Sequence, residues 1–261
     1  MLQALLWDVD GTLAETERDG HRVAFNRAFA ALEVPWRWSE KRYAKLLAVS
    51  GGRERLLHDM RSRLRAPADA GQRAALAARL HALKNECYAR IVAEAGMPLR
   101  DGVRELFDDC ARAGLRMAIV TTTSRANVQA LLGAHLGAGW RERFAAVVCG
   151  EDAPRKKPEP QAHLMALDVL GVAPRQALAV EDAPAGVAAA RAAGVPVVVT
   201  RSHYFAAARD EGALAAGPSL GSGEGWCAPL AARARSRIDL ALLGAWHAMA
   251  PHAHGGIEVP A

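Results

Sequence analysis

The chain has 261 residues, 51% of them hydrophobic, so it can bury the core of one domain of ordinary size or of a domain with an inserted module. The 33 lysines and arginines are dispersed among 28 acids, so the net charge of +5 suits an anionic small molecule as well as nucleic acid. No apolar run approaches the roughly 20 residues that span a bilayer, and the N-terminus lacks a signal-peptide pattern, so we expect a cytoplasmic protein with no membrane or nucleic-acid partner. The cysteines are scattered and form no CxxC pair, which argues against a zinc site or a disulfide framework.

The first apolar segment, residues 2 to 9, is typical of a buried strand, and it runs into two carboxylates, Asp8 and Asp10. Residues i and i+2 of an extended chain point the same way, so both carboxylates can address one site. Gly11 then allows a sharp turn. Two like charges this close raise each other's cost of ionisation, which predicts a neutralising cation nearby. A capping or turn role for the same residues is the structural alternative.

Residues 15 to 96 contain no convincing strand and show three helical faces. The faces comprise Ala24, Phe25, Ala28, Phe29 and Leu32, then Leu56, Leu57, Met60 and Leu64, then Leu76, Leu80, Leu83, Cys87 and Ile91. We predict that residues 15–96 form an α-helical cap domain inserted after the first strand, hinged near residues 13–15 and 96–98. Residues 1–14 and 97–261 then form the core domain.

After residue 98, apolar β-rich segments alternate with helical periods. Helices are predicted over residues 101–114, around a face of Ala162, Met165, Ala166, Val169 and Leu170, and over a short stretch up to Gly194. Strands are predicted within residues 115–124, 144–150, 177–182 and 195–200. The alternation predicts an α/β fold with a doubly wound, Rossmann-like parallel sheet. In the last sixty residues, 217–226 reads as a loop and only 237–249 suggests regular structure.

Polar residues follow several of these predicted strands. Thr121 and Thr122 offer hydroxyl and N–H groups for phosphoryl oxygens, and Lys157 precedes a proline. Glu181 and Asp182 form a second acidic pair, and hard carboxylate oxygens are what Mg²⁺ prefers. Ligands of open α/β sheets bind at the carboxyl ends of the strands, so we expect these groups to converge. Taken singly, a threonine run or a basic loop is more often plain structure or solvated surface.

Together, the DxDGT segment, the strand-end hydroxyl, the lysine before proline and the acidic pair resemble the haloacid dehalogenase superfamily of phosphotransferases. Dehalogenases themselves lack the second aspartate, so Asp10 favours the phosphatase and phosphomutase branch. The runs "DVDGTLAETERDGHRVAFNRAF", "PWRW" and "SGGRERL" are similar to the CbbY-type Calvin-cycle phosphatases, from Met1 to about Val199. This resemblance implies removal of the 1-phosphate from xylulose-1,5-bisphosphate, a misfire product that inhibits Rubisco. We expect a small-molecule sugar bisphosphate as partner and a monomer.

The resemblance also implies roles for the core residues. Asp8 is expected to attack phosphorus and form an aspartyl-phosphate, and Asp10 to act as general acid and then general base. Thr121 and Lys157 are expected to hold phosphoryl oxygens. The expected cofactor is Mg²⁺, bound by Asp8, the backbone carbonyl of Asp10, Asp182 and, directly or through water, Glu181.

One position departs from many relatives, which have serine after the acidic pair where this chain has Ala183. The missing hydroxyl puts direct binding of the metal by Glu181 in doubt.

The cap is expected to select the sugar. Glu17 and His21 lie one helical turn apart, and the resembling family uses matching positions near the substrate. Arg53 or Arg55 is expected to take the distal phosphate, with Thr122 as a further binding residue. A buried structural histidine and a solvated charged loop are the alternatives. Two further pairs are expected not to bind ligands: Trp36 and Trp38 pack the cap, and His252 and His254 lie in a Gly-rich, disordered terminus.

Two other functions remain open from sequence. A sugar phosphomutase of the same superfamily shares every motif, and differs in needing a bisphosphate cofactor and in releasing no free phosphate. A non-catalytic binding or regulatory protein is the alternative from another class. Salt-sensitive, Mg²⁺-independent binding to nucleic acid without phosphate release indicates that class.

Overall fold

The computed structural model describes residues 1–209, 211–229 and 236–250. In these ranges six strands form one parallel sheet in the order β3-β2-β1-β4-β5-β6. The strands are β1 (Ala4–Trp7), β2 (Arg116–Val120), β3 (Ala146–Val148), β4 (Ala177–Glu181), β5 (Val197–Thr200) and β6 (Ala215–Gly217). Strand β1 lies between β2 and β4, so the segment after it enters the centre of the carboxyl edge, where ligands bind in sheets of this kind. The doubly wound α/β fold expected from sequence is confirmed.

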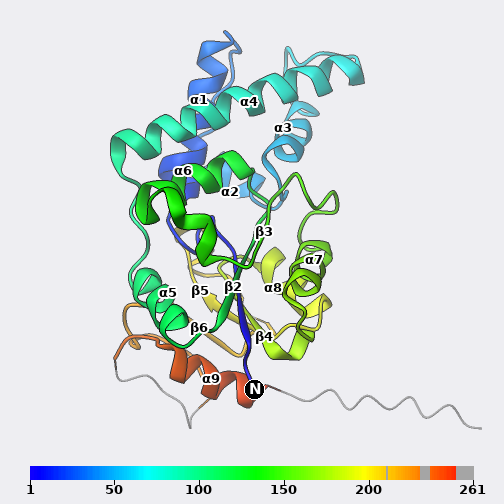
Figure 1. Ribbon diagram of the computed structural model, residues 1–261. Coiled ribbons are helices and arrows are strands. Elements are labelled where there is room, and N and C mark those ends of the chain that lie inside the picture. Colours follow the sequence, from blue (N-terminus) through cyan, green and yellow to red (C-terminus); the bar gives the residue numbers. More distant parts are fainter. Residues whose placement is uncertain (210, 230–235, 251–261) are drawn as a thin grey trace, which may run out of the picture.

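Helices cover both faces of the sheet (Figure 1). The helices α5 (Val103–Arg112), α6 (Arg125–Leu136) and α9 (Leu240–Ala248) pack on one face, and α7 (Gln161–Leu170) and α8 (Pro184–Ala192) on the other. Leu5 and Trp7 of β1 point into the first layer, whereas Ala4 and Leu6 point into the second. Burial on both faces explains why the strands read as continuous apolar runs.

Between β1 and α5 the chain is helical. Its elements are the π-helix η1 (Glu17–His21) and the α-helices α1 (Arg22–Ala31), α2 (Glu40–Leu46), α3 (Gly52–Met60) and α4 (Ala70–Ala95). The side chains of Ser39 and Asp69 accept hydrogen bonds from the first turns of α2 and α4, which satisfies N–H groups that lack helical partners. Trp36 and Trp38 are buried against Phe29, as expected for packing residues.

In Figure 1 these helices lie beyond one end of the sheet, with α1 and α4 at the top of the view. They are not isolated from the sheet, because Tyr88 and Ile91 of α4 share a hydrophobic cluster with Val128 and Leu131 of α6. The chain crosses between the two parts where Ala14 pairs with Leu99. The exact division into a cap of residues 15–96 and a core of residues 1–14 and 97–261 stays a prediction.

Two predicted helical faces were wrong in detail. Leu64 is 90% exposed, because α3 ends at Met60 and the chain turns before residue 64. Val169 is 64% exposed, because the buried side of α7 runs through His163 and Leu167 instead.

Three elements had not been predicted, namely α2, α6 and the edge strand β6. The remaining short helices are η2 (Ala138–Arg143), η3 (Pro174–Gln176) and η4 (His203–Phe205). Among the helices of the described ranges, none combines the length and apolar character needed to cross a bilayer. His252 and His254 lie outside the described residues.

Candidate active site

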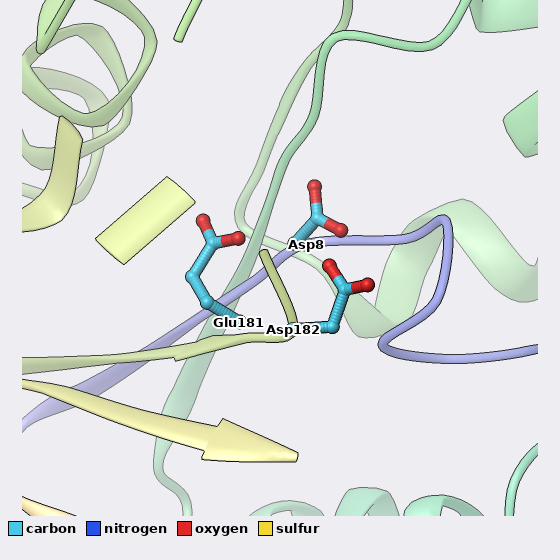
Figure 2. A group of neighbouring side chains, drawn as sticks. All are labelled: Asp8, Glu181 and Asp182. Atoms are coloured by element: carbon cyan, nitrogen blue, oxygen red, sulfur yellow. The ribbon is translucent and has the colours of Figure 1, made fainter. Parts of the chain in front are cut away.

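Three buried carboxylates meet at the carboxyl edge of the sheet. Asp8 directly follows β1, and Glu181 and Asp182 stand at the end of the neighbouring strand β4 (Figure 2). One carboxylate oxygen from each lies within 4.8 Å of the other two. The parallel pairing of Trp7 with Val180 brings the ends of both strands to the same level. The sequence expectation that these groups converge is thereby met for all three.

Lys157 is the cation that contacts this cluster. Its Nζ donates to Asp8 Oδ1 at 2.7 Å, to Glu181 Oε1 at 2.8 Å and to the carbonyl oxygen of Val120 at 2.8 Å. The side chain is only 5% exposed, and its three donors are all used, so the ammonium is fixed in place. One positive charge therefore faces three carboxylates.

Burial and the excess of negative charge shift the pKa values of the three carboxyl groups. Burial raises the pKa of Asp8 to about 7 against the lowering effect of Lys157, and Glu181 raises it further. Burial also raises the pKa of Glu181, and raises that of Asp182 well above its usual range. Full ionisation of the cluster therefore calls for an additional cation.

The residues present fit a divalent metal ion with oxygen ligands. Two glycines leave room for the carboxylates: a Cβ at Gly11 would lie 2.1 Å from Asp182 Oδ2, and one at Gly186 would lie 1.9 Å from Glu181 Oε2. Gly11 also adopts a φ of 86°, which favours glycine. The cluster thus has the charge and the ligand atoms that a metal ion requires.

Asp10 belongs to a different environment. Its Oδ1 accepts hydrogen bonds from Thr16 Oγ1 at 2.6 Å and lies 2.8 Å from His21 Nε2. Burial alone would raise the pKa of Asp10, but the charge and hydrogen bonds of His21 and Thr16 outweigh it and hold the pKa below its ordinary value. The pKa values of the two aspartates of the first motif are therefore shifted in opposite directions, upward for Asp8 and downward for Asp10.

A cavity of about 360 Å³ opens in front of these groups. The predicted site residues that line it are Asp8, Asp10, Glu17, Arg55, Thr121, Thr122, Lys157, Glu181 and Asp182. Its apolar wall includes Leu47 of the segment after α2 and Phe205 of η4. A smaller recess adjoins it, lined by His21 among others. Arg53 is exposed and lines neither cavity, so the structure does not bring it to the other predicted residues.

On the helical side, Glu17, Tyr43 and Arg55 form one buried network. The hydroxyl of Tyr43 donates to Glu17 Oε2 at 2.5 Å, and Arg55 Nη1 donates to that hydroxyl at 2.7 Å. Arg55 Nη1 also lies 3.6 Å from Glu17 Oε2. Burial raises the pKa of Tyr43 well above its ordinary value, so the hydroxyl stays protonated at neutral pH. Arg55 is therefore fixed at the boundary of both cavities.

Thr121 and Thr122 stand where the loop after β2 reaches the main cavity. The N–H of Thr121 donates to Val148 and its Oγ1 accepts from the N–H of Thr123 at 3.2 Å. The hydroxyl proton of Thr121 remains available for an oxygen in the cavity.

Several residues of the site had not been predicted from sequence, Lys84 and Ser202 among them. Lys84 of α4 is buried in the recess, with its Nζ 5.3 Å from the ring centre of Phe25 and 5.4 Å from that of Tyr88, and it forms no hydrogen bond or ion pair with the described residues. Burial lowers its pKa to about 8. Ser202, beyond β5, donates from Oγ to Asp182 Oδ2 at 2.6 Å. A single lysine or serine between motifs carries no local signal.

The comparisons with known proteins agree with this geometry. Residues 2–194 match the family model described as haloacid dehalogenase-like hydrolase. The protein CbbY of Cupriavidus necator is 44% identical over 247 residues, covering 94% of this chain and 97% of that protein. CbbY of Rhodobacter capsulatus is 45% identical over 203 residues, covering 78% and 87%.

Among solved structures, a variant of CbbY from Rhodobacter sphaeroides in complex with xylulose-1,5-bisphosphate superimposes with a TM-score of 0.79. It has 39% sequence identity, and the match covers 85% of this chain and 97% of that one. The family model and these similarities lead to one conclusion, that the chain belongs to the haloacid dehalogenase-like hydrolases.

Proposed function

We propose that this chain is a Mg²⁺-dependent phosphatase that removes the 1-phosphate from xylulose-1,5-bisphosphate and so protects Rubisco. The chemistry is supported by the buried Asp8–Lys157 pair, which lines one cavity together with Asp10. The substrate is supported by the CbbY complex with xylulose-1,5-bisphosphate and by the identity to CbbY proteins. The working unit in this proposal is a monomer in the cytoplasm.

Asp8 is the nucleophile in this proposal. One carboxylate oxygen attacks phosphorus in line with the departing sugar oxygen, which forms an aspartyl-phosphate and splits one difficult displacement into two steps. The Lys157 ammonium, 2.7 Å from Asp8, favours the ionised carboxylate and orients it, and offsets charge on the phosphoryl group. When bound by Asp8, Asp182, the carbonyl of Asp10 and Glu181, directly or through water, Mg²⁺ supplies further positive charge to the phosphoryl oxygens.

Asp10 moves the proton. It donates a proton to the departing sugar oxygen, and afterwards takes one from the water that attacks the aspartyl-phosphate, releasing inorganic phosphate and restoring Asp8. Its bonds to His21 and Thr16 favour the ionised form needed for the second step. The dianionic phosphate of the substrate raises the pKa of Asp10 for the first step.

The distal phosphate needs cations on the helical side. Arg55 is buried at the boundary of both cavities, and Lys84 lines the recess without a hydrogen-bonded partner among the residues that the structure describes. A planar guanidinium can bind a phosphate through two parallel hydrogen bonds, and a buried ammonium adds a point charge. Thr121 and Thr122 supply hydroxyls to the phosphoryl group at the opposite end of the substrate.

The test is Mg²⁺-dependent phosphate release from xylulose-1,5-bisphosphate, ribulose-1,5-bisphosphate, glucose 1-phosphate and phosphoglycolate, with Asp8→Asn as control. The proposal expects a strong preference for xylulose-1,5-bisphosphate that Asp8→Asn abolishes. An equal rate on all four compounds contradicts the substrate but keeps the chemistry. Sugar-phosphate isomerisation without free phosphate, stimulated by a bisphosphate, indicates the phosphomutase instead.

A further inference from the structure

Ser202 provides a hydrogen bond to the proposed metal-binding carboxylate Asp182. The Oγ–Oδ2 distance is 2.6 Å, and each residue is 4% exposed, so water does not compete for the contact. Within the described residues no donor engages the other oxygen of Asp182, Oδ1. The hydroxyl therefore holds one carboxylate oxygen and leaves the second free.

The alanine at position 183 makes the hydrogen bond between Ser202 and Asp182 more important. Ala183 follows Asp182 directly and lines the cavity, but its methyl group can donate no hydrogen bond. Among the described residues, the side-chain donor that reaches Asp182 is thus supplied by a segment 20 positions further along the chain.

The segment that carries Ser202 is itself held by a partly buried arginine. Arg100 donates to the carbonyl oxygens of Thr200 at 2.9 Å, Arg201 at 2.7 Å and Pro218 at 2.6 Å, and also to that of Gly11. One guanidinium thereby ties the two residues before Ser202 to the turn that follows Asp8 and Asp10.

The same turn packs directly on the hydrogen-bonded pair. A Cβ at Gly11 would lie 2.1 Å from Asp182 Oδ2 and 3.0 Å from Ser202 Cβ. The Gly11 backbone and Ser202 therefore both pack close to Oδ2, which leaves Asp182 little freedom to rotate.

We propose that Ser202 is a positioning residue for the metal site, which fixes Asp182 Oδ2 so that Oδ1 faces the ion, with Arg100 holding the Ser202 segment in register. Ser202 thus supplies the hydroxyl that position 183 lacks. The inference rests on the proposed function in one respect, the Mg²⁺ site that includes Asp182. Groups that orient a metal ligand typically change metal affinity about 10- to 100-fold when removed.

The experiment measures Mg²⁺ binding by calorimetry without substrate, and the Mg²⁺ dependence of phosphate release, for Ser202→Ala. The matched control is Ser62→Ala, a serine in the helical part whose hydroxyl bonds to Asp59 and Arg42. We expect the Mg²⁺ dissociation constant to rise about tenfold in Ser202→Ala, with kcat at saturating Mg²⁺ largely kept. Ser202→Cys retains a weak donor of similar size, so its Mg²⁺ dissociation constant is expected to lie between those of the unaltered chain and Ser202→Ala.

A second variant tests the inference independently of whether Ser202→Ala folds. Arg100→Lys keeps a charge but loses most of the four carbonyl contacts, and is expected to weaken Mg²⁺ binding in the same direction. Unaltered Mg²⁺ affinity in a folded Ser202→Ala protein, or equal weakening in Ser62→Ala, overturns the inference while the phosphatase assignment stands. If the unaltered chain itself binds no Mg²⁺, the metal-dependent function and this inference both fail.

Discussion

His21 Nε2 lies 2.8 Å from Asp10 Oδ1, which joins the first turn of the helical part to the proposed general acid and base. The imidazole also stacks on Tyr88 of α4, with ring centres 4.3 Å apart. Tyr88 is buried and Asp10 is partly buried, so the imidazole of His21, which contacts both, has a defined orientation. The position of Asp10 therefore depends on how the helical part sits on the sheet.

Replacing His21 tests this dependence. We expect His21→Asn to lower kcat about 100-fold, because proton transfer by a misoriented Asp10 loses most of its 10²- to 10⁴-fold contribution. KM for the bisphosphate should change much less. Thr16→Val, which removes the other hydrogen bond to Asp10, should act in the same direction. Steady-state kinetics with His135→Asn as control provide the check, since the imidazole of His135 bonds only to a backbone carbonyl among the described residues. Equal kcat in His21→Asn and the control contradicts the role.

The two candidate arginines should separate in kinetics. Arg55 is buried at the boundary of both cavities, whereas Arg53 is exposed and lines neither. Arg55→Lys replaces two parallel hydrogen bonds by a point charge, so KM for xylulose-1,5-bisphosphate is expected to rise at least about tenfold. Arg53→Lys should leave KM within about twofold, since exposed charges contribute little. A larger KM change from Arg53→Lys assigns the distal phosphate to that residue instead.

Glycine at position 186 is required by the acid cluster. A Cβ there would lie 1.9 Å from Glu181 Oε2, so Gly186→Ala must displace the carboxylate that Lys157 holds. We expect the variant to lose at least about 90% of its activity and to unfold at a lower temperature, as overpacked buried sites do. The control is Gly244→Ala in α9, where a Cβ meets nothing within 4 Å. That change should be neutral or stabilise by about 0.5–1 kcal/mol. Full activity of Gly186→Ala is the contrary result.

The effect of Mg²⁺ on stability should depend on pH. The pKa of Asp8 rises on folding from 3.8 to about 7, chiefly through burial, so the metal-free folded chain binds a proton that the unfolded chain releases between these values. Its contribution to the metal-free stability therefore falls as pH rises through this window. A bound divalent ion replaces the proton, so Mg²⁺ should raise Tm more at pH 8 than at pH 5.

Thermal unfolding with and without Mg²⁺ at the two pH values measures this effect. The difference cancels the titration of groups remote from the site. Asp8→Asn removes the titrating carboxyl, so its Mg²⁺ effect should be smaller and vary less with pH. A Tm increase that is equal at both pH values in the unaltered chain contradicts the linkage.

The amino-acid sequence by itself determined the parallel sheet and the core half of the candidate site. Asp8, Glu181 and Asp182 were identifiable because each is polar and stands at the end of an apolar strand segment. Lys157 was identifiable because it precedes a proline and completes the set of motifs that resembles the haloacid dehalogenase superfamily. In a parallel sheet those ends lie at one edge whatever the details of packing. The convergence of the carboxylates could therefore be predicted from local sequence.

Tertiary structure alone decided the rest, because it depends on contacts between distant segments. Which arginine is buried, where the Lys84 ammonium lies and which hydroxyl reaches Asp182 follow from how helices and loops pack against one another. A small rotation of α7 leaves Val169 exposed, and the end of α3 at Met60 leaves Leu64 exposed. The short edge strand β6 was invisible for the same reason, since its three residues, Ala215–Gly217, are a strand only through pairing with β5.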